Sequence, residues 1–311
     1  MTAPPSVADR SPEEVLRRLE LAVVRRLDGM LQGDYRGLVP GHGTEAGDAR
    51  AYVPGDDVRR IDWNVTARTT LPHVRDTVAD RELETRVLVD LSASLDFGTA
   101  ACEKRDLAVA AVAAVGFLTA RLGNRIGAVV LQGSSIREVP PRPGRDHLLA
   151  LLHPVVAAPR VEGGGPADLA AGLSRLAATA RRRGLVVVVS DFLADRGWEQ
   201  PLRAVASRQE VLAVEVVDPR ELELPAVGVL TLVDPETGRR RDVQTANAGL
   251  RARYAAAAAE QRAAIAAALR AAGADHLVLR TDSDWLVDLV RFVAGRRTRV
   301  QARARLEPLT T

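Results

Sequence analysis

The sequence predicts an α/β protein with a doubly wound, mostly parallel sheet flanked by helices, and three observations support this fold class. Strand and helix patterns alternate from residue 86 onward, as they do where parallel strands are joined by right-handed crossovers. Leu185–Ser190 reads LVVVVS, a β-branched run typical of a central strand covered on both faces. Asp90 and Asp191 lie at the carboxyl ends of two such strands, where open α/β sheets hold their sites.

Composition excludes several classes of protein. The chain of 311 residues carries a net charge of +3, which is too small for a dedicated nucleic-acid binder. Cys102 is the only cysteine, so there is neither an intramolecular disulfide nor a cysteine-based zinc site. The opening MTAPPSVADR lacks the apolar core of a signal peptide, and the longest uncharged apolar run, Leu107–Ala120, is shorter than the ~20 residues of a membrane span. We therefore expect a cytoplasmic protein.

The N-terminal part of the chain is predicted to differ from the rest. Ser11-Pro-Glu-Glu14 is typical of a capping box, and apolar residues recur at helical spacing as far as about Gly33. Residues 34–83 are rich in Gly, Pro and charge, which favours an irregular or short-stranded segment. We expect three parts: residues 1–83 with the helix and the charged segment, the α/β domain at 84–295, and an Arg-rich tail at 296–311. The helix and the charged segment are expected to pack on the α/β domain.

Apolar periodicity and turn residues predict the elements of the domain in order. Strands are expected at Arg86–Leu91, Arg125–Leu131, Ile136–Val139, Leu185–Ser190, Val211–Val217, Val229–Val233, Asp242–Gln244 and His276–Leu279. Helices are expected at Glu103–Leu122, Asp146–His153, Ala167–Arg182, Trp198–Arg208, Leu250–Ala272 and Trp285–Ala294. Gly133-Ser-Ser135 and Asp234-Pro-Glu-Thr-Gly238 are typical of hairpin turns, the first at a sheet edge.

Oxygen side chains follow the first predicted strand at alternate positions. Asp90-x-Ser92-x-Ser94 offers one carboxylate and two hydroxyls, which are hard ligands suited to Mg²⁺. Parallel strands end at one edge, so Asp191 is expected to converge on the same point. Because Ser and Asp are also the usual turn and cap residues between a strand and a helix, a structural role stays open.

This motif resembles the metal-ion-dependent adhesion site of von Willebrand factor A domains. The resemblance implies a Mg²⁺ held by Ser92, Ser94, a threonine from a second loop and Asp191, with a partner's carboxylate completing the shell. In this chain Gly163-Gly-Gly-Pro-Ala-Asp168 has Ala167 where the threonine is expected, so a water must substitute. Asp168 would reach the metal only through water, and it is equally suited to the first turn of a helix.

A longer motif near the N-terminal end carries a second resemblance, which covers nearly the whole chain. Gly41-x-Gly43-x-Glu45 and the segment from Asp48 to Arg68, which contains Pro-Gly-Asp-Asp and Ile-Asp-Trp, resemble the bacterial domain-of-unknown-function 58 family. The resemblance implies a partnership with a MoxR-type AAA+ ATPase in chaperone-like assembly or activation of client proteins. The chain has no P-loop motif of its own, so ATP hydrolysis would belong to the partner.

The same segment offers a weakly indicated partner surface. Arginines alternate with aspartates in this stretch, which favours an internal ion-pair cluster. The alternative is a docking surface for an acidic patch of the ATPase, with a tryptophan as anchor. The candidate partner-binding residues are Arg59, Arg60, Trp63 and Arg68.

The leading hypothesis is a non-enzymatic protein-interaction module with a Mg²⁺-dependent adhesion-type site. One alternative is a scaffold whose degenerate site binds no metal. A second is a Mg²⁺-dependent phosphatase-like hydrolase that uses Asp90 as nucleophile, although Ser92 stands where such enzymes need a second acid. The five histidines show no zinc spacing and no catalytic triad is indicated. Asp282-Ser-Asp284 is typical of a helix N-cap rather than a metal cluster.

Overall fold

A computed structural model describes residues 3–8, 10–31, 49–52, 61, 63–69, 71–75, 83–160, 167–194 and 197–306. Contacts divide the chain into two units, one formed by residues 1–39 and 83–311 and the other by residues 40–82. In the smaller unit, β1 (Ala49–Ala51) pairs antiparallel with β2 (His73–Arg75), and α2 (Trp63–Thr69) lies between them in the sequence. The described part of residues 34–83 thus contains two short strands and a short helix.

The larger unit is built on a six-stranded sheet with the order β10-β7-β6-β3-β4-β5. All neighbours are parallel except β4 and β5, which form an antiparallel hairpin at one edge. The strands are β3 (Glu84–Asp90), β4 (Arg125–Gln132), β5 (Ser135–Arg142), β6 (Gly184–Ser190), β7 (Glu210–Val217) and β10 (Asp275–Arg280). Counted along the chain this is the order 3-2-1-4-5-6 of doubly wound folds, whose switch point lies between β3 and β6. The predicted fold class is confirmed.

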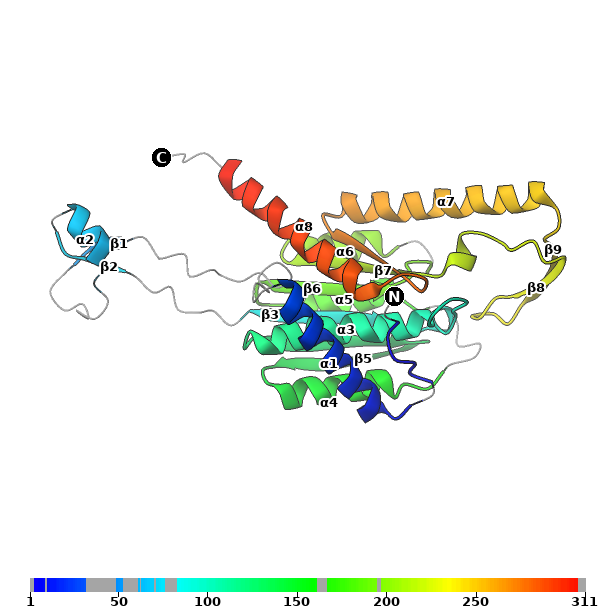
Figure 1. Ribbon diagram of the computed structural model, residues 1–311, viewed down its shortest axis with the longest axis horizontal. Helices are drawn as coiled ribbons and strands as arrows, with labels where there is room; N and C mark the ends of the chain where they lie inside the picture. Colours follow the sequence, from blue (N-terminus) through cyan, green and yellow to red (C-terminus); the bar gives the residue numbers. More distant parts are fainter. Residues whose placement is uncertain are drawn as a thin grey trace. The chain divides into compact units, whose positions relative to one another are not determined.

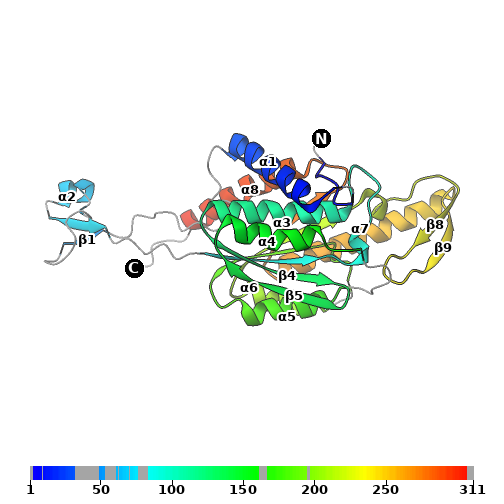
Figure 2. The same ribbon diagram turned by 90° about the horizontal axis from the view of Figure 1, so that it is seen from below.

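Helices cover both faces of this sheet (Figure 1, Figure 2). One face carries α1 (Pro12–Leu31), α3 (Lys104–Arg121), α4 (Arg145–Val156) and α8 (Trp285–Leu306). The other carries α5 (Leu169–Thr179), α6 (Glu199–Ala206) and α7 (Ala248–Ala271). Along β3 the buried side chains alternate between the two layers, with Val87 and Val89 on the α3 side and Leu88 on the α5 side. Both layers therefore bury apolar side chains against every central strand.

Helix α3 is buried all round, which explains the place of α1. Residues Leu107–Leu118 of α3 are apolar on every side of the helix, and such a helix needs cover on both sides. The sheet covers one side, and the buried α1 residues Val15, Leu16 and Leu19 cover the other. The N-terminal helix thus packs on the α/β domain, as predicted, whereas residues 40–82 form a unit of their own.

Every predicted element after residue 83 is observed, with shifted ends. Helix α5 stops at Thr179 and leaves Arg181–Arg183 outside it, since the chain must turn there into β6. Helix α8 continues to Leu306 instead of ending at Ala294, because the Arg-rich residues after Gly295 are good helix formers. The tail predicted from residue 296 is therefore helical as far as Leu306.

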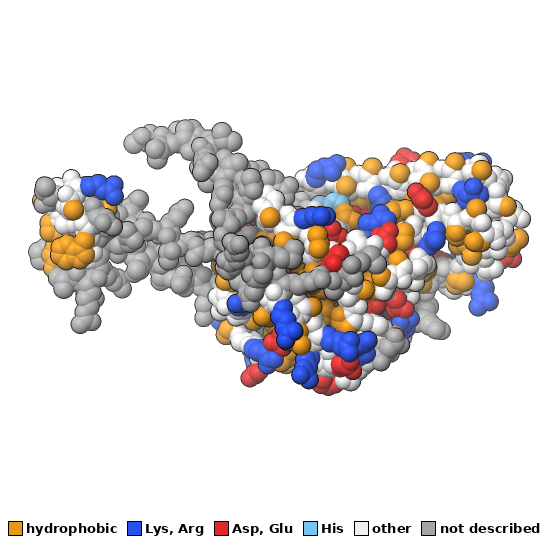
Figure 3. Space-filling model, viewed as in Figure 1, with side chains coloured by type: hydrophobic (Ala, Val, Ile, Leu, Met, Phe, Trp, Pro, Cys, Tyr) orange, Lys and Arg blue, Asp and Glu red, His pale blue; other side chains and the backbone are white. Residues whose placement is uncertain are grey.

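Two smaller features complete the larger unit. β8 (Val229–Val233) and β9 (Arg240–Gln244) form the predicted second hairpin, and 3-10 turns lie at Ala93–Leu95 and Pro219–Glu221. No helix among the described residues is long and apolar enough to cross a membrane. On the face shown in Figure 3, acidic and basic side chains are interspersed rather than gathered into a stripe of one sign.

Candidate functional site

The switch point between β3 and β6 brings two carboxyl groups to one edge of the sheet. Asp90 ends β3 and Asp191 directly follows β6, and each side chain is 1% exposed. The Ser190 hydroxyl donates to Asp90 Oδ2 at 2.8 Å, which ties the two strand ends together. Asp90 Oδ1 accepts from the backbone N–H of Ser92 at 2.9 Å. Both oxygens of Asp90 are therefore held in fixed directions.

The two serines lie beside these carboxyl groups. A 3-10 turn at Ala93–Leu95 follows β3 and sets Ser92 Oγ 3.1 Å from Ser94 Oγ. The Ser94 hydroxyl also hydrogen-bonds to the Asp191 carboxylate. The four residues predicted from their spacing are thus brought together, although Asp191 is a hundred positions away from Asp90 in the sequence.

The backbone after Asp191 is strained. Phe192 has φ of 56°, which is unusual for a bulky residue. Packing holds it there, because its buried ring lies against Trp198 with centroids 5.3 Å apart. In this conformation the Leu193 N–H donates to Asp191 Oδ1 at 3.0 Å, which fixes the carboxylate. Strained residues of this kind cluster at functional sites.

A buried lysine, which the sequence analysis missed, belongs to the same site. Lys104 begins α3, is 0% exposed, and donates from Nζ to Asp191 Oδ2 at 2.8 Å and to Glu221 Oε1. Burial lowers the pKa of Lys104, but Asp191 and Glu221 outweigh this effect and raise it above the usual range. Lys104 is therefore a permanent cation beside Asp191.

The charged network continues into α7 and β10. Arg262 of α7 donates to Glu215 Oε1 at 2.8 Å, to Glu221 Oε2 at 3.0 Å and to the Asp191 carbonyl at 3.1 Å. His276 Nε2 lies 2.6 Å from Glu215 Oε2. Of these three residues, only Glu215 could have been recognised from the sequence. It is a lone acid in the apolar strand VLAVEVV, and a buried acid needs a partner.

The carboxyl groups of Asp90 and Asp191 differ in their surroundings. Burial, and then the charge of Asp191, raise the pKa of Asp90. Burial also raises the pKa of Asp191, but Lys104 outweighs that effect, so this pKa lies below the usual range. Among the described residues no cation contacts Asp90. Asp90 is therefore the carboxylate that lacks a positive partner.

The charges of the network suit a divalent cation. Its four carboxylates are those of Asp90, Asp191, Glu215 and Glu221, and its two permanent cations, Lys104 and Arg262, contact the last three of these among the described residues. These described groups leave a formal charge of −2. No cluster of three or more His, Cys, Asp or Glu side chains suited to a metal occurs in the described part of the chain. Asp90, Asp191, Ser92 and Ser94 offer two carboxylates and two hydroxyls, which are hard oxygen atoms of the kind that Mg²⁺ prefers.

The second loop contributes little to this set. Ala167 is buried and has no ligating atom. Asp168 is exposed and caps α5, where its Oδ1 accepts from the Ala171 N–H at 2.7 Å. Of the two interpretations of Asp168, the structure favours the helix cap.

The predicted partner residues lie in the smaller unit. Arg59 and Arg60 fall outside the described residues. Trp63 is 71% exposed at the start of α2, and Arg68 is exposed near its end. A core role for Trp63 is therefore disfavoured, which leaves it accessible as an anchor.

Two mycobacterial proteins are similar to this chain in sequence. An uncharacterized protein of Mycobacterium tuberculosis (strain H37Rv) is 55% identical over 282 residues, which cover 91% of this chain and 89% of that protein. An uncharacterized protein of Mycobacterium avium is 48% identical over 159 residues, or 51% of this chain and 94% of that protein.

Solved structures resemble the chain more weakly. The conserved hypothetical protein BatB from Bacteroides thetaiotaomicron has 14% identity and a TM-score of 0.40, covering 70% of this chain and 99% of that one. A von Willebrand factor type A protein from Catenulispora acidiphila has 10% identity and a TM-score of 0.31, covering 47% and 35%. The fold assignment rests on the strand order, whereas the family rests on sequence. The family described as "Protein of unknown function DUF58" matches residues 48–264, and this chain belongs to it.

Proposed function

We propose that this protein is a non-enzymatic protein-interaction module whose site at the switch point holds Mg²⁺ and takes a carboxylate from a partner. One observation carries the proposal. Asp90 is a buried carboxylate without a cation among its described contacts, and it lies beside a second carboxylate and two hydroxyls. Leaving such a charge unpaired in a protein interior is costly. A divalent ion would compensate it.

Each residue of the chain has a defined part in this proposal. Asp90, Ser92, Ser94 and Asp191 would hold the ion with hard oxygen atoms. Asp90, Asp191 and Lys104 by themselves carry a formal charge of −1, so these three groups with the ion bound would be positive and would attract an anionic group. When bound, Mg²⁺ supplies an open position that an acidic residue of a partner can fill. Because Ala167 supplies no ligand, water would fill the remaining position.

The proposed partner is a MoxR-type AAA+ ATPase, acting with this protein in chaperone-like assembly or activation of clients. Family membership supports this partnership, as does the lack of a P-loop in the sequence. Exposed Trp63 and Arg68 suit a docking surface. The partnership would be supported if the ATPase co-purifies with the wild-type protein but not with Trp63→Ala, and if both proteins have the same melting temperature. Retention of the ATPase by that variant would contradict the role of Trp63.

Titration of Mg²⁺ against thermal stability tests the metal site directly. Wild type should be stabilised, and Asp90→Ala should not respond. Asp168→Ala should respond like wild type, since its side chain caps α5. Equal Mg²⁺ responses in wild type and Asp90→Ala would contradict the proposal. Metal analysis of the purified protein adds an independent measurement.

A metal-free scaffold is the second candidate function, and Lys104 favours it. Its ammonium already compensates Asp191, so with Asp90 protonated the three side chains Asp90, Asp191 and Lys104 would carry no net charge without an ion. A hydrolase that uses Asp90 as nucleophile is disfavoured, because that side chain is 1% exposed and both of its oxygens accept hydrogen bonds. Absence of metal and of any Mg²⁺ response would favour the scaffold.

A further inference from the structure

Two hollows flank the edge strand β5. One has a volume of about 420 Å³ and lies between the β4–β5 hairpin and the end of α4. The other has a volume of about 520 Å³ and lies between β5 and α5. β5 is the last strand in the sheet order, so its outer side is unpaired among the described residues. An open strand edge with a hollow on each face is an arrangement suited to binding an extended chain.

Alternate side chains of β5 line the two hollows. Ser135 and Arg137 face the hollow at α4, whereas Ile136 and Glu138 face the hollow at α5. Successive residues of a strand point to opposite faces of the sheet, so both hollows belong to one continuous stretch of β5. A strand added along this edge would direct its own side chains alternately into the same two hollows.

The backbone of this stretch can accept another strand. β5 pairs with β4 from Gln132↔Ser135 to Ile126↔Arg142. In an antiparallel pair every second residue turns its N–H and C=O away from the partner, toward the open side. Pro140 and Pro141 lack the N–H and so end the usable stretch, which is Ser135–Val139. Ile136, within this stretch, is 40% exposed.

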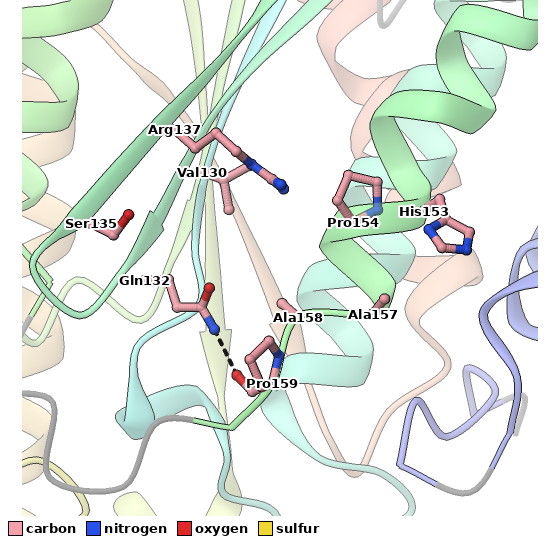
Figure 4. Close-up of a pocket in the computed structure, with 9 residues that line it drawn as sticks. All are labelled: Val130, Gln132, Ser135, Arg137, His153, Pro154, Ala157, Ala158 and Pro159. Atoms are coloured by element: carbon pink, nitrogen blue, oxygen red, sulfur yellow. Dashed lines mark hydrogen bonds between the residues drawn. The ribbon is translucent and has the colours of Figure 1, made fainter.

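The hollow at α4 suits an anionic side chain. Figure 4 shows Arg137 on one side of this hollow and His153 on the other, and no carboxylate lines it. Gln132 is already occupied, because its Nε2 donates to the Pro159 carbonyl at 2.7 Å. Glu13 lies 3.2 Å from His153 Nε2, which leaves Arg137 as the cation without a carboxylate among its described contacts.

The hollow at α5 suits a small apolar side chain. Ile136 and Ala171 form its apolar lining. The charged residues at its border are already paired, since Arg175 Nε donates to Glu138 Oε2 at 2.8 Å and Arg86 lies 3.3 Å from Glu138 Oε1. An added charge would find no free partner among these residues, so selection here is by apolar burial.

We propose that β5 binds an extended segment of another protein whose side chains alternate between acidic and small apolar, added as a further strand. A second copy of this chain fits less well. Pairing two copies about Arg137, the centre of the usable stretch, would set two arginines opposite each other, which is unfavourable. The proposal is independent of the metal site, because β5 contributes no candidate ligand.

Peptide binding measured in EDTA tests the proposal without the metal. The probe is a fluorescein-labelled, end-blocked peptide of alternating Val and Glu, followed by fluorescence anisotropy. It should bind about tenfold or more tightly than the same peptide with Lys in place of Glu, because Arg137 selects the charge. N-methylation of the peptide backbone at alternate residues should abolish binding. Absent binding of the acidic peptide, or equal binding of both, would overturn the proposal.

Two variants on the same strand locate the site. Arg137→Glu should reverse the preference toward the Lys peptide, whereas Arg142→Glu, exposed on β5 but outside both hollows, should leave it unchanged. Melting temperatures of both variants should match that of wild type, since both positions are on the surface. If Arg137→Glu and Arg142→Glu change the peptide preference equally, the assignment of the binding site to the two hollows would be wrong. A concentration-dependent dimer of wild type that Arg137→Ala strengthens would also overturn it, because removing the opposed arginines would then favour pairing of β5 with a second copy.

Discussion

Replacing Lys104 by Met should destabilise the protein strongly in EDTA, and Mg²⁺ should recover part of the loss. Met retains most of the buried aliphatic volume of Lys104 and removes only the ammonium that contacts Asp191 and Glu221. Removing one partner of a buried ion pair costs about 3–5 kcal/mol, because the remaining charge stays buried without compensation. The formal charge of the network then falls from −2 to −3, which increases the attraction for a divalent ion. Mg²⁺ at one hundred times its dissociation constant should return about 2.7 kcal/mol.

Urea unfolding in EDTA and in Mg²⁺ measures both effects for wild type and Lys104→Met. The control is Arg145→Met, which breaks an ion pair with Glu20 whose Arg145 side chain is 59% exposed. Exposed pairs contribute about 0–1 kcal/mol, so this variant should lose little stability and should not change its response to Mg²⁺. A Lys104→Met protein as stable as wild type in EDTA would refute the role of the buried charge. Equal Mg²⁺ stabilisation of the two proteins would refute the link between that charge and the metal.

Four further outcomes are expected. Burial and Asp191 raise the pKa of Asp90, so metal-free wild type should lose stability as pH rises from about 4 through that pKa, and Asp90→Asn should lack this loss in urea titrations. Burial, with nearby acids, raises the pKa of Cys102 to about 12, so native protein should react with iodoacetamide far more slowly than unfolded protein; equal rates would contradict this. Gly184→Ala should cost about 1–3 kcal/mol or more in unfolding free energy, since its Cβ would lie 1.9 Å from the Glu84 carbonyl oxygen. Asp168→Ala should cost about 1 kcal/mol and leave Mg²⁺ binding unchanged, and a lost Mg²⁺ response would restore that residue as a ligand.

Local pattern was enough to predict the sheet, because each strand carries its own signal. The run LVVVVS predicted β6, and the alternation of strands with helices predicted that the strands run mostly parallel. Helix α1 was equally clear as an amphipathic helix, but its packing surface was not, because periodicity shows which face is apolar and not what covers it. The sequence of α3 indicates where α1 packs. Because α3 is apolar on all sides, it needs a second element to cover the side away from the sheet.

The candidate site could be predicted only where its residues end strands. Asp90 and Asp191 were found because parallel strands share an edge. Lys104 and Arg262 were missed, because they come from helices and their charges look like ordinary solvated positions in the sequence. Only the three-dimensional arrangement shows that their heads meet between carboxylates. For that reason the sequence indicated a metal site but not its buried counter-charge.

The connection between α1 and β3 has a consequence for how this chain can diversify. Residues 40–82 form their own unit, yet they are inserted between two elements that both belong to the sheet unit. The entropy of closing such a connection rises by only about 0.6 kcal/mol for each doubling of its length. The insert can therefore be lengthened, shortened or exchanged while the sheet unit stays folded. Helix α1 precedes α3 and α4 in the chain but packs against both, so it can dock only after the insert has been synthesised.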